Sequence, residues 1–129
     1  MSCRIYMDHA ATTEMLPEVR EAMEPYLREE YGNASTSYDM GVRMHDAIEE
    51  AREKIAWVID AQPEEIFFTS GGSESDNWVI KSVAGEKKNS GKHLITTRIE
   101  HHAVLRSCQY LESLGYEVTY LDVDDYGLV

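Results

Sequence analysis

Residues 66–77 read IFFTSGGSESDN, and this stretch decides the fold class of the chain. Ile66 to Thr69 form a short apolar run of β-type residues, which predicts a buried strand. Gly71 and Gly72 end the run, and apolar residues between 78 and 84 then recur at helical spacing. Ser73 and Asp76 have the spacing of a capping box, which predicts that the helix begins there. The stretch therefore predicts a strand that leads into a helix through glycines.

The same alternation continues downstream. Residues 93–97 predict a second strand, Ala103 to Leu114 a helix closed by Gly115, and residues 117–121 a third strand. The order β-α-β-α-β predicts an α/β fold with a mainly parallel sheet and flanking helices. A sheet of three strands leaves edges that a complete domain would pair or cover, so we expect the fold to be incomplete here.

Upstream, two helices and two polar loops are expected. A helix begins at Pro17 and extends to about Glu30, with a kink or a break at Pro25. A longer helix has an apolar face that extends from Met44 to Ile59. Residues 8–13 and 32–36 are rich in small and polar side chains, and both predict loops.

The composition limits the classes of partner. The 129 residues suit one domain or a part of one, and 24 acidic against 12 basic residues give a net charge of −12. We therefore expect neither nucleic acid nor a membrane as a partner. The chain has neither a long apolar window nor the apolar run of a signal peptide, which favours a cytoplasmic location. Cys3 and Cys108 are expected to be ordinary thiols, with Cys108 on the apolar face of its helix.

The glycine-rich stretch is a candidate phosphate site. Backbone N–H groups at a helix N-terminus bind anions, and glycines let a ligand approach the backbone closely. Neither the dinucleotide-binding glycine pattern nor the P-loop lysine is present. A capped turn without a ligand is about equally compatible with residues 68–77.

Histidines after the second predicted strand form another candidate site. Glu100-His101-His102 follow the carboxyl end of that strand, where parallel sheets bind ligands. An imidazole there could stack on a planar ring or transfer protons. The alternative is a surface or N-cap histidine. No metal site is expected, because a third ligand at suitable spacing is missing.

Four motifs in order resemble the cysteine desulfurases of aminotransferase class V. They are YMDHAATT at residues 6–13, YGNAST at 31–36, residues 68–77, and Glu100-His101. The resemblance covers the whole chain and corresponds to roughly the first third of a family member. It implies the type I pyridoxal-phosphate-dependent transferase fold, which is aspartate-aminotransferase-like, and a homodimer. Residues 1–15 would be an N-terminal segment of the small domain, and residues 16–129 the beginning of the cofactor-binding large domain.

The resemblance also implies roles for individual residues. Gly72 and Ser73 would hold the phosphate of pyridoxal 5'-phosphate, and His101 would stack on its ring and assist catalytic proton transfer. Asn33 would belong to a substrate loop. Family members usually have proline at position 34 and histidine at position 38, where this chain has Ala34 and Tyr38. These departures are compatible with a subgroup that acts on another substrate, such as selenocysteine.

The implied reaction converts L-cysteine to L-alanine and transfers sulfur as an enzyme persulfide. It would serve the assembly of iron-sulfur clusters or other sulfur-containing cofactors, with a sulfur-acceptor or scaffold protein as partner. The Schiff-base lysine and the catalytic cysteine belong to later segments of the family, so this chain alone is expected to be inactive. The alternatives are a non-catalytic module that associates with a full-length partner, and a fragment of a selenocysteine lyase or of another class V aminotransferase.

Overall fold

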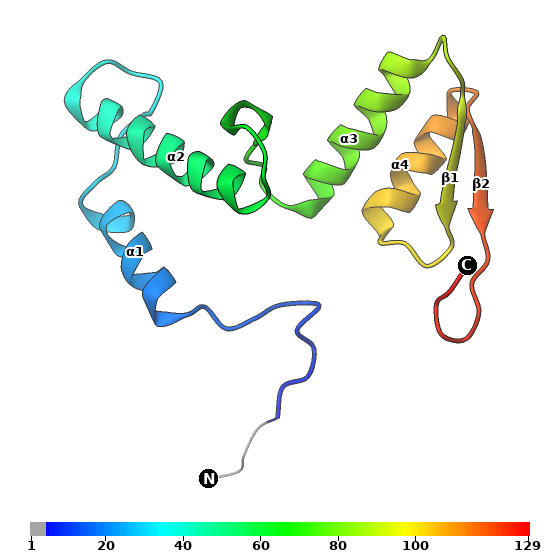
Figure 1. Cartoon of the computed structure of the whole chain (residues 1–129), viewed down its shortest axis with the longest axis horizontal. Helices are drawn as coiled ribbons and strands as arrows, with labels where there is room; N and C mark the ends of the chain where they lie inside the picture. Colours follow the sequence, from blue (N-terminus) through cyan, green and yellow to red (C-terminus); the bar gives the residue numbers. More distant parts are fainter. Residues whose placement is uncertain (1–4) are drawn as a thin grey trace. The chain divides into compact units, whose positions relative to one another are not determined.

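The computed structural model describes residues 5–129, so Cys3 and the prediction made for it lie outside the described residues. The chain divides into two compact units, with the boundary between Ile66 and Phe67. Figure 1 follows both units along the chain. The predicted division into a small-domain segment, residues 1–15, and the beginning of the large domain, residues 16–129, is not the same as the division into these two units. It stays a prediction.

The first unit is helical. It contains α1 (Pro17–Arg28), α2 (Asp39–Val58) and the short 3-10 helix η1 (Pro63–Glu65). Pro25 lies inside α1 and does not break it, since the helix continues to Arg28 and the Pro25 carbonyl accepts the N–H groups of Glu29 and Glu30 at 2.9 and 2.8 Å. The break considered for Pro25 is therefore wrong, because proline removes one donor but keeps its acceptor.

Helix α2 begins five residues before the predicted apolar face. Its first turn is polar and starts at Asp39, so apolar periodicity does not detect it. An acidic residue is favourable in that position because it faces the positive end of the helix dipole.

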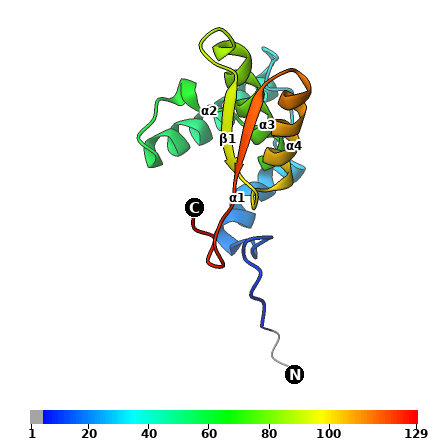
Figure 2. The ribbon, with the colours of Figure 1, turned by 90° about the vertical axis from the view of Figure 1, so that its right-hand side faces the viewer.

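The second unit is a β-α-β arrangement preceded by a helix. It consists of α3 (Gly72–Lys87), β1 (His93–Thr97), α4 (His102–Ser113) and β2 (Glu117–Leu121). Strands β1 and β2 are parallel, with His93 opposite Glu117 and Thr97 opposite Leu121. Figures 1 and 2 show α3 and α4 on the same side of the two strands. The predicted α/β class with parallel strands and flanking helices is confirmed.

The α3–α4 interface holds most of the buried side chains of this unit. Cys108 and Leu111 on α4 are 2% and 3% exposed, and Ser107 is fully buried with its hydroxyl donating to the Ala103 carbonyl at 2.8 Å. Small residues at a helix contact allow close packing of the two backbones. The prediction that Cys108 belongs to the core is confirmed.

Gly115 closes α4, as predicted. Its φ of 86° lies in the left-handed region that glycine adopts without steric cost. The N–H of Gly115 donates to the Glu112 carbonyl at 2.9 Å, and the N–H of Tyr116 donates to the Leu111 carbonyl at 3.1 Å. These bonds satisfy carbonyls that the helix end would leave without partners.

The buried strand predicted at Ile66 to Thr69 is wrong. In residues 5–129 the sheet consists of β1 and β2 alone, and the side chains of Phe67 and Phe68 are 64% and 49% exposed. A strand requires a neighbour that pairs with its backbone, and an apolar sequence does not supply one.

Within residues 5–129, no helix is both long enough and apolar enough to span a membrane.

Candidate functional site

The loop before α3 exposes its backbone. Gly71 has φ 156° and ψ 177°, a conformation that is essentially restricted to glycine. A Cβ atom built on Gly71 or Gly72 would find no other atom within 4 Å. Open space therefore adjoins this stretch of main chain, and a ligand can approach it closely.

The capping box predicted for Ser73 and Asp76 is wrong. Gly71 is the N-cap of α3, and no side chain caps this position. Instead, the Glu74 carboxylate accepts the Ser70 hydroxyl at 2.7 Å and the Ser70 N–H at 2.6 Å. Gly71 reaches the N-cap conformation easily, which places Ser73 inside the helix and leaves Glu74 in reach of Ser70. Both hydrogen bonds from Ser70 lower the pKa of Glu74 and keep it ionised.

Two backbone donors remain at the start of α3. The N–H groups of Glu74 and Ser75 donate to the Gly71 carbonyl at 3.1 and 3.2 Å. In the described part of the chain, the N–H groups of Gly72 and Ser73 have no acceptor. Because they lie at the positive end of a 16-residue helix, they form an anion-binding arrangement.

Hydroxyl groups brace this loop. The hydroxyls of Thr69 and Ser75 lie 2.7 Å apart, and the Thr69 hydroxyl also donates to the Gly71 carbonyl at 3.2 Å. These contacts join Thr69, two residues before the first glycine, to the first turn of α3. The loop is therefore held from both sides while its glycine backbone stays accessible.

His101 caps α4. Its Nδ1 accepts the N–H of Ala103 at 3.1 Å, so the N-cap alternative raised by the sequence is confirmed. The ring is exposed, and its centroid lies 6.2 Å from that of His102. Since Nδ1 is an acceptor, the proton of the neutral ring is on Nε2, which has no partner among residues 5–129. The cap fixes the ring and leaves its faces and Nε2 available.

The glycine loop and His101 lie at the same end of the second unit. The helices α3 and α4 both begin at the end where β1 and β2 finish (Figure 1). This carboxyl edge is where open α/β sheets bind ligands. The starts of α3 and α4, with Gly72, Ser73 and His101, therefore lie at the carboxyl end of the two strands (Figure 1), and their assignment to a cofactor stays a prediction.

Asn33 belongs to the first unit and forms a compact turn. Its Oδ1 accepts the Ser35 N–H at 2.9 Å, and its carbonyl accepts the Thr36 N–H and hydroxyl at 3.1 and 2.5 Å. Its own N–H donates to the Tyr38 phenol oxygen at 3.1 Å. The side-chain NH₂ of Asn33 has no acceptor within the described residues. The two N–H groups of the Asn33 side-chain amide are therefore available to a ligand.

Gly41 allows the first turn of α2 to pack directly against the Asn33 turn. Gly41 is buried in the first turn of α2, and a Cβ there would lie 2.7 Å from the carbonyl oxygens of Asn33 and of Thr36. Real Cβ atoms essentially never approach backbone so closely. The turn and the helix can be in contact only because residue 41 has no side chain.

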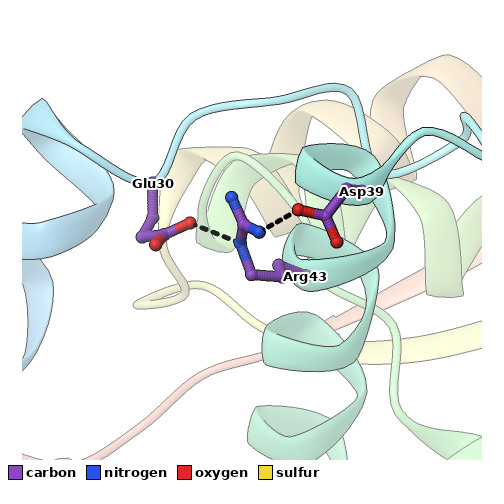
Figure 3. Close-up of polar contacts among 3 residues, drawn as sticks. All are labelled: Glu30, Asp39 and Arg43. Atoms are coloured by element: carbon purple, nitrogen blue, oxygen red, sulfur yellow. Dashed lines mark hydrogen bonds and ion pairs between the residues drawn. The ribbon is translucent and has the colours of Figure 1, made fainter.

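Arg43 connects the two ends of the same segment. Its guanidinium lies between the carboxylates of Glu30 and Asp39 (Figure 3), with Nε 2.8 Å from Glu30 and Nη1 bonded to Asp39. Both carboxylates raise the pKa of Arg43, the Glu30 hydrogen bond most of all. The spacing of Asp39 and Arg43 by four residues on one helix was a sequence signal for their pair, whereas the contact with Glu30 had none.

The other predicted loop, residues 8–13, also forms a turn. The Ala11 N–H donates to the Asp8 carbonyl at 3.1 Å, and the Tyr6 hydroxyl donates to the same carbonyl at 2.8 Å. The rings of Tyr6 and His9 meet edge to face with centroids 5.3 Å apart.

The glycine loop and the histidine lie at the carboxyl end of a parallel β-α-β unit, which is the place where α/β proteins bind ligands. The chain matches the family described as Aminotransferase class-V over residues 5–129, and it belongs to that family. The predicted resemblance to the cysteine desulfurases of this class is confirmed by the relatives.

Two curated relatives are named cysteine desulfurase IscS. The protein from Dictyoglomus turgidum is 54% identical over 129 residues, which cover 100% of this chain and 33% of that protein. The protein from Methanosarcina thermophila is 54% identical over 125 residues, which cover 97% of this chain and 31% of that protein. The chain therefore spans about a third of the length of the curated relatives that it matches.

Solved structures agree with this assignment. A NifS-like protein superposes with a TM-score of 0.86 at 43% identity, covering 92% of this chain and 33% of the other. A protein described as SspA in complex with cysteine has a TM-score of 0.82 at 43% identity, covering 90% of this chain and 33% of the other. The predicted fold class is that of these proteins.

Proposed function

We propose that this chain provides the phosphate-binding part of a pyridoxal-phosphate-dependent cysteine desulfurase. The complete reaction would convert L-cysteine to L-alanine and pass sulfur on as an enzyme persulfide for the assembly of iron-sulfur clusters or other sulfur-containing cofactors. The observation that carries this proposal is the glycine loop at the start of α3, with two N–H groups free to bind an anion, in a chain 54% identical to proteins named cysteine desulfurase.

The loop fits the phosphate of the cofactor. The N–H groups of Gly72 and Ser73 point outward from the positive end of α3, and open space adjoins Gly72. The Glu74 carboxylate accepts both donors of Ser70 and does not occupy the N–H groups of Gly72 and Ser73. The negative group is thereby held on Ser70, and the two N–H groups stay available for the ligand.

His101 would lie against the cofactor ring. Its cap on Ala103 fixes the imidazole plane, so a planar ring could stack on it without a further loss of side-chain freedom. Its Nε2 could hold or deliver a proton near the reacting atoms. When bound, the cofactor supplies an electron sink that stabilises negative charge on the substrate carbon.

Asn33 would contribute to substrate binding. Its free side-chain NH₂ can donate hydrogen bonds to a polar group of the amino acid substrate. A related solved protein is described in complex with cysteine, which supports an amino acid of this kind as the substrate.

Further properties follow from the same proposal. We expect the 129 residues by themselves to be inactive, because the resemblance assigns the Schiff-base lysine and the catalytic cysteine to other segments. The working protein would be a cytoplasmic homodimer that delivers sulfur to an acceptor or scaffold protein.

A chimera tests the proposed function. The segment of the Dictyoglomus turgidum relative that aligns with this chain would be replaced by this chain, which is matched over its full length. The chimera should bind pyridoxal 5'-phosphate and release alanine from cysteine. His101→Ala should remove most of that activity, while His102→Ala, its neighbour, should keep it. A folded, cofactor-loaded chimera without cysteine-dependent alanine would contradict the proposal.

A further inference from the structure

The turn at Asn33 is closed by a side chain that is not among the residues assigned to the site. The phenol oxygen of Tyr38 accepts the Asn33 N–H at 3.1 Å across five residues. A backbone N–H in an irregular loop otherwise needs water or another acceptor. Tyr38 thus completes a turn whose other bonds come from Ser35 and Thr36.

The position of Tyr38 suits this task. It is the N-cap residue of α2, with extended backbone at φ −75° and ψ 158°, and its carbonyl accepts the Val42 N–H at 3.0 Å. The backbone of Tyr38 is therefore fixed by the helix, and its ring reaches back over the turn to residue 33. A phenol oxygen held in this way can fix the Asn33 backbone without a contact to the Asn33 side chain.

Other contacts hold the same segment but leave the Asn33 N–H untouched. Arg43 joins Glu30, before the turn, to Asp39, after it. Gly41 packs against the carbonyl side of the turn.

Hydrogen bonds from the Thr36 hydroxyl and the Asn33 N–H lower the pKa of Tyr38, in agreement with its role as an acceptor.

We propose that Tyr38 is a positioning residue for Asn33: its phenol oxygen holds the Asn33 N–H, and so fixes the turn from which the Asn33 side-chain amide is presented to a ligand. The proposal rests on the proposed function only in treating the Asn33 turn as a substrate loop. The chain has tyrosine where the family pattern has histidine, so this acceptor is a property of its own sequence.

Amide hydrogen exchange in the full 129-residue chain, without ligand, tests the proposal. Tyr38→Phe keeps the ring and removes the oxygen. A single neutral hydrogen bond changes such an equilibrium by roughly 2- to 12-fold, so exchange at the Asn33 N–H should be faster by about that factor. The amide proton resonance of Asn33 should also move upfield, which loss of packing alone would not cause.

Arg43→Met is the matched control. It removes the guanidinium that joins Glu30 to Asp39 and leaves the Tyr38 phenol oxygen and its contact with the Asn33 N–H in place. Exchange at the Asn33 N–H should then stay close to the wild-type rate. The proposal is overturned if Tyr38→Phe leaves exchange and resonance at Asn33 unchanged, if Arg43→Met accelerates exchange equally, or if the wild-type amide exchanges as in an unstructured peptide. A failure to bind cofactor at Gly72 would leave these rates unaffected, so the two failures are distinguishable.

Discussion

Gly41→Ala should destabilise the first unit, although alanine is the better helix former. Alanine at a helical glycine normally gains about 0.5–1 kcal/mol. At position 41 the new methyl would lie 2.7 Å from the carbonyl oxygens of Asn33 and Thr36 and would also meet the Thr36 hydroxyl. Two of these three obstacles are backbone atoms that cannot rotate away. Overpacking of this kind costs about 1–3 kcal/mol, so the net loss should be roughly 1–2 kcal/mol.

Gly85→Ala provides the matched control. Gly85 lies inside α3, and a Cβ there would meet nothing within 4 Å. The same chemical change should therefore stabilise the second unit by about 0.5–1 kcal/mol. Urea unfolding followed by circular dichroism, with hydrogen exchange in α2 and α3 to separate the units, measures both variants. A Gly41→Ala variant as stable as Gly85→Ala would refute the reasoning about the turn.

Three further outcomes are expected in the second unit. Leu111→Ala should lower the free energy of unfolding by about 2–4 kcal/mol because its side chain is 3% exposed, whereas Leu114→Ala, 53% exposed, should cost much less in the same urea titration. Burial, with Glu112 nearby, raises the pKa of the Cys108 thiol, so iodoacetamide should label it only slowly until urea unfolds the chain; rapid native labelling would count against its burial. Partial burial and the hydrogen bond to Glu112 raise the pKa of Tyr120 to about 12 from 10.0. The folded state then retains a proton that the unfolded state loses, so stability should fall as the pH rises from about 10 to about 12, and Tyr120→Phe should remove that decline.

Local patterns in the sequence predicted β1, α4 and β2 well. Each has a clear period, and α4 has a glycine two residues after its last residue. The glycine loop before α3 and the histidine after β1 were also recognisable, because glycines and strand ends are local features. The assignment of Gly72, Ser73 and His101 to a cofactor stays a prediction.

Features that depend on a partner could not be predicted in the same way. Ile66 to Thr69 have the composition of a strand, but pairing depends on a neighbouring strand. The spacing of Ser73 and Asp76 predicted a capping box, whereas Gly71 is the N-cap and the carboxylate near the helix start that bonds to Ser70 is Glu74. The bond from the Asn33 N–H to Tyr38 depends on the path of the whole turn, which no periodicity describes.

The most direct test of the account asks whether the α3 loop binds the phosphate of the cofactor. Pyridoxine 5'-phosphate lacks the aldehyde that reacts with lysines, and pyridoxine is the same ring without phosphate. Titration of the ¹⁵N-labelled chain with each compound reports on the N–H groups of Gly72 and Ser73. The account predicts that the phosphate ester shifts both amide resonances and that pyridoxine does not. Equal shifts with both compounds, or no shift at these two amides while others respond, would contradict it.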